Sequence, residues 1–161
     1  MNNISDHSNL PSFARFWGVR GSLPTPGAST ARYGGNTTCL ELRINGQIII
    51  IDAGSGISPL GTALVDEFGM NPLSLTLLNT HTHWDHIQGF PFFGPILQDG
   101  ARLELFGPQQ EDGTSFMRSV SNAIRQPTFP VELHDLRGKF EFHDVADNDF
   151  MIDGYSVKSR L

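Results

Sequence analysis

The chain has 161 residues, 39% of them hydrophobic, which predicts one globular domain with its own hydrophobic core. A formal net charge of −6, with 11 lysine and arginine residues, argues against a broad nucleic-acid-binding face and favours a small or locally bound substrate. The single cysteine excludes an internal disulfide, and without an 18-residue apolar run or a leader we expect a cytoplasmic protein with no membrane segment.

From residue 13 onward the chain alternates predicted strands and helices, which is typical of an α/β fold. Residues 1–12 are rich in asparagine and serine and predict a flexible N-terminal arm. Strands are expected at 13–19, 38–44, 47–51, 73–78, 102–106, 140–145 and 155–161. Helices are expected at 58–68, 87–97 and 114–126. Turn signals separate them: Asn45-Gly46 favours a tight hairpin, and an aspartate-rich turn is predicted at 147–149.

Three of the six histidines and one carboxylate fall within residues 81–86, directly after a predicted strand. If the backbone stays extended there, His81 and His83 point the same way and can share one metal ion. The turn that follows carries Asp85 and His86 to a neighbouring position, so two ions about 3.5–4 Å apart are conceivable. Imidazole and carboxylate ligands without a nearby cysteine favour an open, catalytic site over a structural zinc cage. The alternative is a cluster of surface histidines.

These residues resemble a known family. His81-Thr82-His83-Trp84-Asp85-His86 has the His-x-His-x-Asp-His form of the metallo-β-lactamase fold superfamily, and residues 50–56 resemble the strand and glycine turn that precede it there. Residues 16–22, 32–39 and 83–93 are similar to the branch that includes phosphodiesterases and tRNA 3′-end processing ribonucleases. The resemblance implies an α/β domain of the αββα sandwich type.

The implied function is a metal-dependent hydrolase of phosphodiester bonds whose nucleophile is a metal-bound hydroxide. On this resemblance, His81 and His83 would bind the first of two divalent ions. Asp85 and His86 would bind the second, and Asp85 would also act as a catalytic residue that positions the hydroxide. Asp52 would support the site from behind without binding metal, a role compatible with its capping the glycine-rich turn. Zinc is the expected metal, with manganese, nickel and iron as alternatives.

Two loop residues, Arg20 and Asn36, are candidate substrate-binding residues, because an arginine fork or an asparagine amide can hold a phosphate oxygen. The alternative is that Arg20 pairs with a carboxylate and Asn36 only suits its turn. Trp84 is expected to pack against the protein, and Cys39 is expected to be a small buried hydrophobic residue.

The resemblance also implies ligands that this sequence lacks: a third histidine for the first metal, an aspartate that bridges both ions, and a final histidine. His134 and His143 lie downstream, but we interpret them as ordinary surface or strand histidines. The domain, residues 13–161, is therefore expected to be truncated to little more than the first half of the sandwich, with the remaining ligands beyond Leu161. An uncovered inner sheet face predicts a homodimer or a requirement for the missing C-terminal half.

Three functions stay open at this point. The first is hydrolysis of a small-molecule or nucleotide phosphodiester. The second is hydrolysis of a thioester or lactam by the same activated hydroxide. The third is a catalytically silent fragment that acts as a binding or assembly module.

Overall fold

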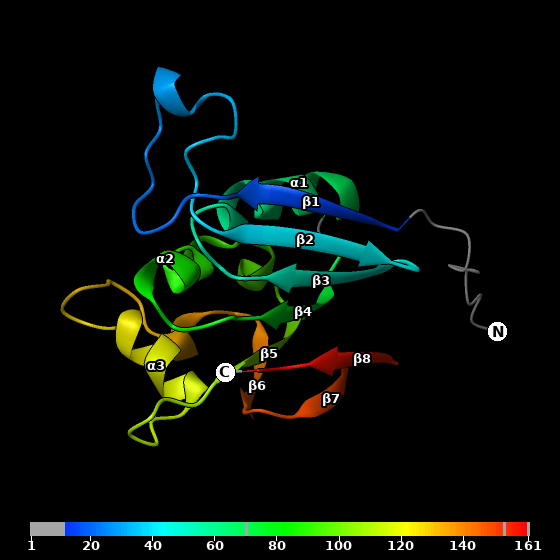
Figure 1. Cartoon of the computed structure of the whole chain (residues 1–161), viewed down its shortest axis with the longest axis vertical. Helices are drawn as coiled ribbons and strands as arrows, with labels where there is room; N and C mark the ends of the chain where they lie inside the picture. The colour runs from blue at the N-terminus through cyan, green and yellow to red at the C-terminus, as the bar shows by residue number, and fades with distance from the viewer. Residues whose placement is uncertain (1–11, 70, 153, 161) are drawn as a thin grey trace.

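The computed structural model describes residues 12–69, 71–152 and 154–160, so the predicted arm lies outside the described residues except for Ser12. A six-stranded sheet has the order β1-β2-β3-β4-β5-β6, and β7 and β8 form a separate hairpin (Figure 1). The strands are β1 (Phe13–Gly18), β2 (Cys39–Ile44), β3 (Gln47–Ile51), β4 (Ser74–Leu78), β5 (Arg102–Pro108), β6 (Lys139–Val145), β7 (Asp149–Ile152) and β8 (Tyr155–Lys158). The α-helices are α1 (Ile57–Phe68), α2 (Trp84–Ile87) and α3 (Phe116–Ala123), and the 3₁₀ turns are η2 (Ala28–Thr30), η3 (Phe90–Phe92), η4 (Gly94–Leu97) and η5 (Leu133–Asp135).

The sheet is mixed, and its strand directions decide where a site can form. β1, β2 and β3 are antiparallel, and the predicted β2–β3 hairpin is confirmed. Its turn has φ 49° at Asn45 and φ 84° at Gly46, the left-handed pair that a primed turn requires. β3, β4, β5 and β6 run parallel. Their carboxyl ends therefore meet at one edge of the sheet, which is where open α/β sheets bind their ligands.

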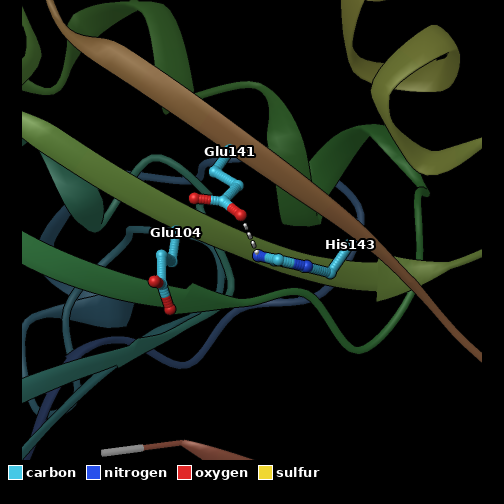
Figure 2. Close-up of side chains that lie close together, drawn as sticks. All are labelled: Glu104, Glu141 and His143. Carbon is cyan, nitrogen blue, oxygen red and sulfur yellow. Dashed lines mark ion pairs between the residues drawn. The ribbon is translucent and has the colours of Figure 1, made fainter.

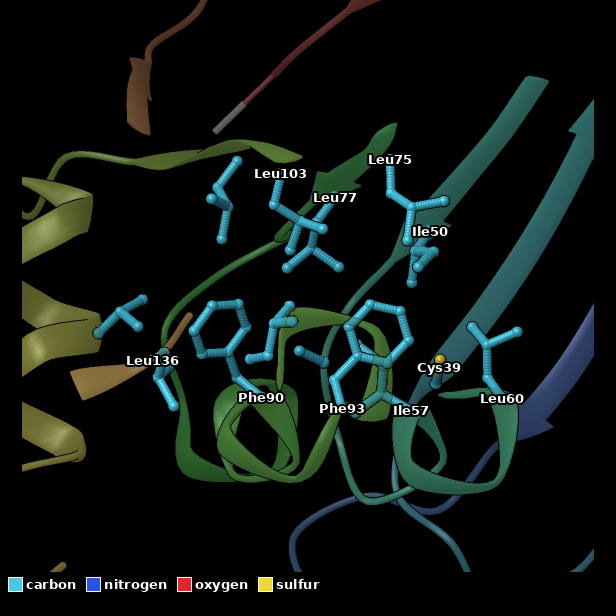
Figure 3. Packing of buried hydrophobic residues seen from close by; sticks show 14 of the residues in the cluster. Cys39, Ile50, Ile57, Leu60, Leu75, Leu77, Phe90, Phe93, Leu103 and Leu136 are labelled. Atoms are coloured by element: carbon cyan, nitrogen blue, oxygen red, sulfur yellow. The ribbon is translucent and has the colours of Figure 1, made fainter. Parts of the chain in front are cut away.

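The hydrophobic core lies between one face of the sheet and the helices. Figure 3 shows Ile50 and Leu77 from the strands facing Leu60 of α1 and Phe90 of η3. Cys39 lies in this core, as predicted, and is completely buried. Burial and the nearby carboxylates of Asp52 and Glu41 raise the pKa of its thiol, so we expect an unreactive side chain. No helix within the described ranges is long and apolar enough to cross a membrane.

The β7–β8 hairpin covers part of the opposite face of the sheet. Phe106 alternates with the core residue Leu105, so its ring points away from the helices. That ring stacks on Phe150 of β7, with ring centroids 5.3 Å apart. At the other end, the side-chain amide of Asn45 donates a hydrogen bond to the Tyr155 hydroxyl at 2.8 Å. The face expected to be bare is therefore partly covered, because the predicted aspartate-rich turn is followed by the unpredicted strand β7.

The prediction of a helix at 87–97 is wrong. α2 begins earlier and is short, and the chain then forms η3 and η4. Pro91 and Pro95 each lack a backbone N–H, and Gly89 and Gly94 weaken a continuous helix, so this composition outweighs the apolar spacing.

Three predicted elements also differ by two residues or more at an end. α3 is shorter than the predicted helix at 114–126: Ser115 caps its N-terminus, and the backbone leaves helical geometry at Ile124. β5 continues through Gly107 and Pro108, two residues beyond the strand predicted at 102–106. β8 ends at Lys158.

The buried carboxylate of Glu41 on β2 forms hydrogen bonds with β1 and with Arg43 on the same strand. Glu41 is 1% exposed and accepts hydrogen bonds from Trp17 Nε1 at 2.8 Å and from Arg43 Nε at 2.6 Å. Arg43 also binds the exposed Glu67 of α1 through two hydrogen bonds of 2.6 Å. The arginine therefore joins the sheet to the helix.

We expect Glu41→Ala to lower the free energy of unfolding by about 1.5–3 kcal/mol, because hydrogen bonds to a buried charge are lost and the Trp17 N–H keeps no partner. The matched control is Glu67→Ala, which removes an exposed ion pair and should cost less than about 1 kcal/mol. Urea denaturation followed by circular dichroism measures both. Equal losses in the two variants would contradict the assigned role of Glu41.

Candidate metal centre

The histidine loop, residues 81–86, leaves the carboxyl end of β4 and enters α2. Its backbone is extended at His83 (φ −60°, ψ 149°) before the helical turn begins. The ring centroids of His81 and His83 lie 4.5 Å apart, and those of His81 and His86 lie 4.0 Å apart. His86 Nε2 is 3.4 Å from Asp85 Oδ2. The structure therefore brings all four predicted ligands into one small space.

Asp52 lies behind this loop, at the end of β3. Its side chain is buried, and its backbone has φ 63°, an uncommon conformation for a residue other than glycine. The carboxylate accepts a hydrogen bond from His86 Nδ1 at 2.8 Å and another from the Thr80 backbone N–H at 2.8 Å. Because an ionised carboxylate only accepts, Nδ1 carries the His86 proton and Nε2 keeps a free lone pair. Histidines that bind metals are typically held in this way.

Thr80 is a candidate site residue that the sequence did not predict. Its hydroxyl lies 3.0 Å from each carboxylate oxygen of Asp52 and 3.1 Å from His81 Nδ1. The hydroxyl proton goes to the carboxylate, so the oxygen accepts from His81 Nδ1 and leaves His81 Nε2 free. Asp52 thus orients one histidine directly and a second through Thr80. The sequence signal that could have indicated this residue is a hydroxyl side chain placed between the predicted strand and the first histidine of the loop.

The charge states of the loop suit metal binding. Burial, with smaller effects from His86 and His83, lowers the pKa of His81 and favours its neutral imidazole. Burial acts to raise the pKa of Asp85, but the hydrogen bond from the Ser22 backbone N–H and the electrostatic effect of the nearby His86 outweigh it, so this pKa is lowered. Neutral imidazole and ionised carboxylate are the forms that coordinate cations. The donor set therefore fits divalent metal ions.

Two glycines let the surrounding turns approach the loop closely. A Cβ atom at Gly54 would overlap the carbonyl oxygen of Asp85, and one at Gly89 would overlap the carbonyl oxygen of Gly54. The carbonyl oxygen of His86 accepts hydrogen bonds from the Ala53 backbone N–H at 2.8 Å and from the Asn79 side chain at 2.9 Å. These contacts set the position of α2 relative to the carboxyl ends of β3 and β4.

Arg20 and Asn36 lie side by side in the β1–β2 loop, where the Arg20 N–H donates to the Asn36 carbonyl at 3.0 Å. The Asn36 side-chain oxygen accepts a hydrogen bond from the Ser55 hydroxyl at 3.1 Å. Thr37 is completely buried and exchanges two further hydrogen bonds with Ser55, of 2.9 and 2.8 Å. Arg20 is exposed, and none of the ion pairs within the described residues involves it. The loop is thus attached to the Asp52–Gly56 turn, and the Arg20 guanidinium is left facing solvent.

Trp84, expected to pack against the protein, is 53% exposed, so this prediction is wrong. The side chain lies on the first turn of α2, a helix of four residues in which Ile87 is the buried residue.

A groove of about 270 Å³ opens beside Thr80, between the sheet and β8. Apolar side chains from both layers line it together with polar and basic residues near the end of β8; the lining residues are Ile51, Leu78, Asn79, Thr80, Phe106, Pro108, Val145, Phe150, Val157, Lys158, Ser159 and Arg160.

A second group of potential ligands lies on β5 and β6, away from the histidine loop. Figure 2 shows Glu104, Glu141 and His143, whose ligand atoms all lie within 4.8 Å of one another. The His143 ring stacks on Phe106, and its Nε2 is 3.7 Å from Glu141. Both glutamates are exposed, and exposed acidic groups often lie this close without an ion. His134 is also exposed and pairs with neighbouring carboxylates.

No family model matches the chain. Its sequence is 28% identical over 147 residues to "Ribonuclease Z" of Lachnoclostridium phytofermentans, an alignment that covers 89% of this chain and 44% of that protein. Its fold is similar to that of a diphosphatase from the PhnP family, with a TM-score of 0.60, 17% identity, and coverage of 91% of this chain and 55% of that one. The metallo-β-lactamase fold protein YhfI from Bacillus subtilis gives a TM-score of 0.55 at 15% identity, over 91% of this chain and 51% of that one.

The chain has the metallo-β-lactamase fold.

The predicted resemblance is confirmed, since the sequence is similar to that of proteins named ribonuclease Z and the fold is that of the metallo-β-lactamase neighbours. The predicted fold class is confirmed, since the six-stranded sheet and its helices match about half of each structural neighbour. The chain spans less than half the length of the curated relatives that it matches.

Proposed function

We propose that the histidine loop holds two divalent metal ions and that the metallo-β-lactamase fold domain containing this chain hydrolyses phosphodiester bonds. One observation carries the proposal. The buried carboxylate of Asp52 accepts the hydrogen bond from Nδ1 of His86, and the Thr80 hydroxyl, which donates to the same carboxylate, accepts the hydrogen bond from Nδ1 of His81. Both imidazoles then keep Nε2 for a metal ion, and His86 Nε2 lies 3.4 Å from the Asp85 carboxylate. The similarity to proteins named ribonuclease Z and to a PhnP-family diphosphatase supports phosphate chemistry.

The proposed roles follow the geometry of the loop. His81 and His83 hold the first ion, and Asp85 and His86 hold the second. Zinc is the proposed metal, with manganese, nickel and iron as alternatives, because imidazole and carboxylate ligands suit all four. When bound, such ions activate water and stabilise negative charge on the attacked centre. Asp52 keeps the histidine rings in their binding orientation.

We assign substrate binding to Arg20 and Asn36. The Arg20 guanidinium is exposed, belongs to a loop that touches Asp85, and can form paired hydrogen bonds with phosphate oxygens. Asn36 holds that loop against the Asp52–Gly56 turn through Ser55. The groove lined by Thr80 offers apolar walls of Phe106 and Phe150. This combination suits a nucleotide or another small phosphodiester.

The proposal is tested with the metal-loaded protein and two chromogenic substrates, bis(4-nitrophenyl) phosphate and an aryl thioester. We expect phosphodiester hydrolysis to fall more than about 100-fold in His83→Ala, because losing a ligand costs more than the 10–100-fold typical of outer-shell partners. His134→Ala, an exposed histidine outside the loop, is the control and should keep full activity. Thioester turnover alone would favour the lactam and thioester alternative. Tight metal binding without turnover of either substrate would favour a binding module.

A further inference from the structure

The loop between β1 and β2 reaches the metal centre through one backbone hydrogen bond. The Ser22 N–H donates to Asp85 Oδ2 at 2.7 Å, across 63 positions of sequence. Ser22 has φ 65°. The next N–H, that of Leu23, donates to the carbonyl of Gly21 at 2.8 Å. A backbone hydrogen bond from residue i+2 to residue i, here from Leu23 to Gly21, forms a γ-turn. With a positive φ at the central residue, here Ser22, it is the rare and strained form of that turn.

Both sides of this turn are fixed, so the strained conformation is held in place. On one side, Arg20 pairs with Thr37 in a parallel bridge. On the other side, the Thr25 N–H donates to the carbonyl of Gly35 at 2.8 Å. The side chain of Ser22 is exposed, so packing of the side chain does not account for the strain. The contact that this turn makes with the metal centre is the hydrogen bond from the Ser22 N–H to the Asp85 carboxylate.

We propose that Ser22 is a positioning residue whose strained backbone holds the Asp85 carboxylate in the orientation that binds metal. This inference rests on the metal-binding role proposed for Asp85. Asp85 Oδ2 receives the Ser22 N–H and also lies 3.4 Å from His86 Nε2. A carboxylate pinned at one oxygen has lost its free rotation before a metal arrives, so less ordering is required on binding. Strained backbone of this kind persists where the surrounding structure over-determines it, typically at functional sites.

The test varies the backbone preference at position 22 while keeping the N–H donor. Glycine adopts positive φ without strain, whereas a β-branched residue strongly disfavours it. We therefore expect Ser22→Val to weaken Co²⁺ binding roughly tenfold and to change the visible absorption bands of bound Co²⁺, as for loss of an outer-shell partner. Ser22→Gly should bind Co²⁺ as wild type does or more tightly. Ser29→Val, an exposed serine on η2 of the same loop, is the matched control and should match wild type.

Each outcome decides between the alternatives. Ser22→Ala is a milder change that should fall between the wild type and the valine variant, and it replaces the valine variant if that protein does not fold. Circular dichroism checks folding in every case. If the alanine and valine variants bind Co²⁺ with the wild-type affinity and spectrum, Ser22 is not a positioning residue, whereas the proposed function stands. If the wild-type chain itself binds no Co²⁺, the metal role of Asp85 fails and this inference fails with it.

Discussion

Gly89→Ala is expected to lower the free energy of unfolding by about 3 kcal/mol or more, the upper range for overpacking a filled interior. The added methyl group would overlap the carbonyl oxygen of Gly54 and would lie 2.7 Å from Ile57 Cγ2. Backbone atoms cannot rotate out of the way, so α2 or the Asp52–Gly56 turn would have to move. Both segments carry site residues. The same substitution should therefore disrupt metal binding as well as stability.

Gly94→Ala is the matched control for this prediction. It lies five positions further along the same segment, and the nearest atom to its added methyl group would be Val65 Cγ2 at 3.6 Å, an ordinary van der Waals contact. We expect a change within about 1 kcal/mol, since substitutions free of such features have small effects. Urea unfolding measured by circular dichroism compares the two variants. If Gly89→Ala proves as stable as Gly94→Ala, Gly89 does not lie in close contact with the Gly54 carbonyl oxygen.

The second large effect is expected for Asp52→Asn, which should weaken Zn²⁺ or Co²⁺ binding by about 10–100-fold. The amide matches the carboxylate in shape but accepts at one atom only. It cannot satisfy the Thr80 N–H, the Thr80 hydroxyl and His86 Nδ1 together. One or both histidines then lose the fixed orientation that leaves Nε2 free.

Isothermal titration calorimetry with Co²⁺ measures the effect, and Asp66→Asn on the exposed side of α1 serves as the control with wild-type affinity expected. A further variant separates the two histidines: Thr80→Val removes the hydroxyl that links Asp52 to His81 but leaves the direct bond between Asp52 and His86, so its loss of affinity should be smaller than that of Asp52→Asn. An affinity within threefold of wild type for Asp52→Asn would show that Asp52 does not orient the ligands.

Much of the fold was predictable because its signals are local. The apolar run of β3, the Asn45-Gly46 turn and the helix ending at Gly69 all depend on residues within a few positions of one another. The predictions failed where local signals compete. At residues 87–97 the apolar spacing favoured a helix while prolines and glycines favoured 3₁₀ turns, and the short strand β7 was hidden beside an aspartate-rich turn. β7 is stabilised by its pairing with β8 and by the stacking of Phe150 on Phe106, which no local pattern contains.

The sequence by itself determined the metal ligand candidates, since His81, His83, Asp85 and His86 lie within six positions and one short loop carries them all. It also determined the superfamily resemblance that the fold comparison confirms. Only the tertiary structure decided which atoms orient those ligands. Asp52 meets His86 across 34 positions and Ser22 meets Asp85 across 63, and the donor from Ser22 is a backbone N–H that every residue except proline possesses. Such a donor has no signature in the sequence, because its direction depends on the path of the folded chain.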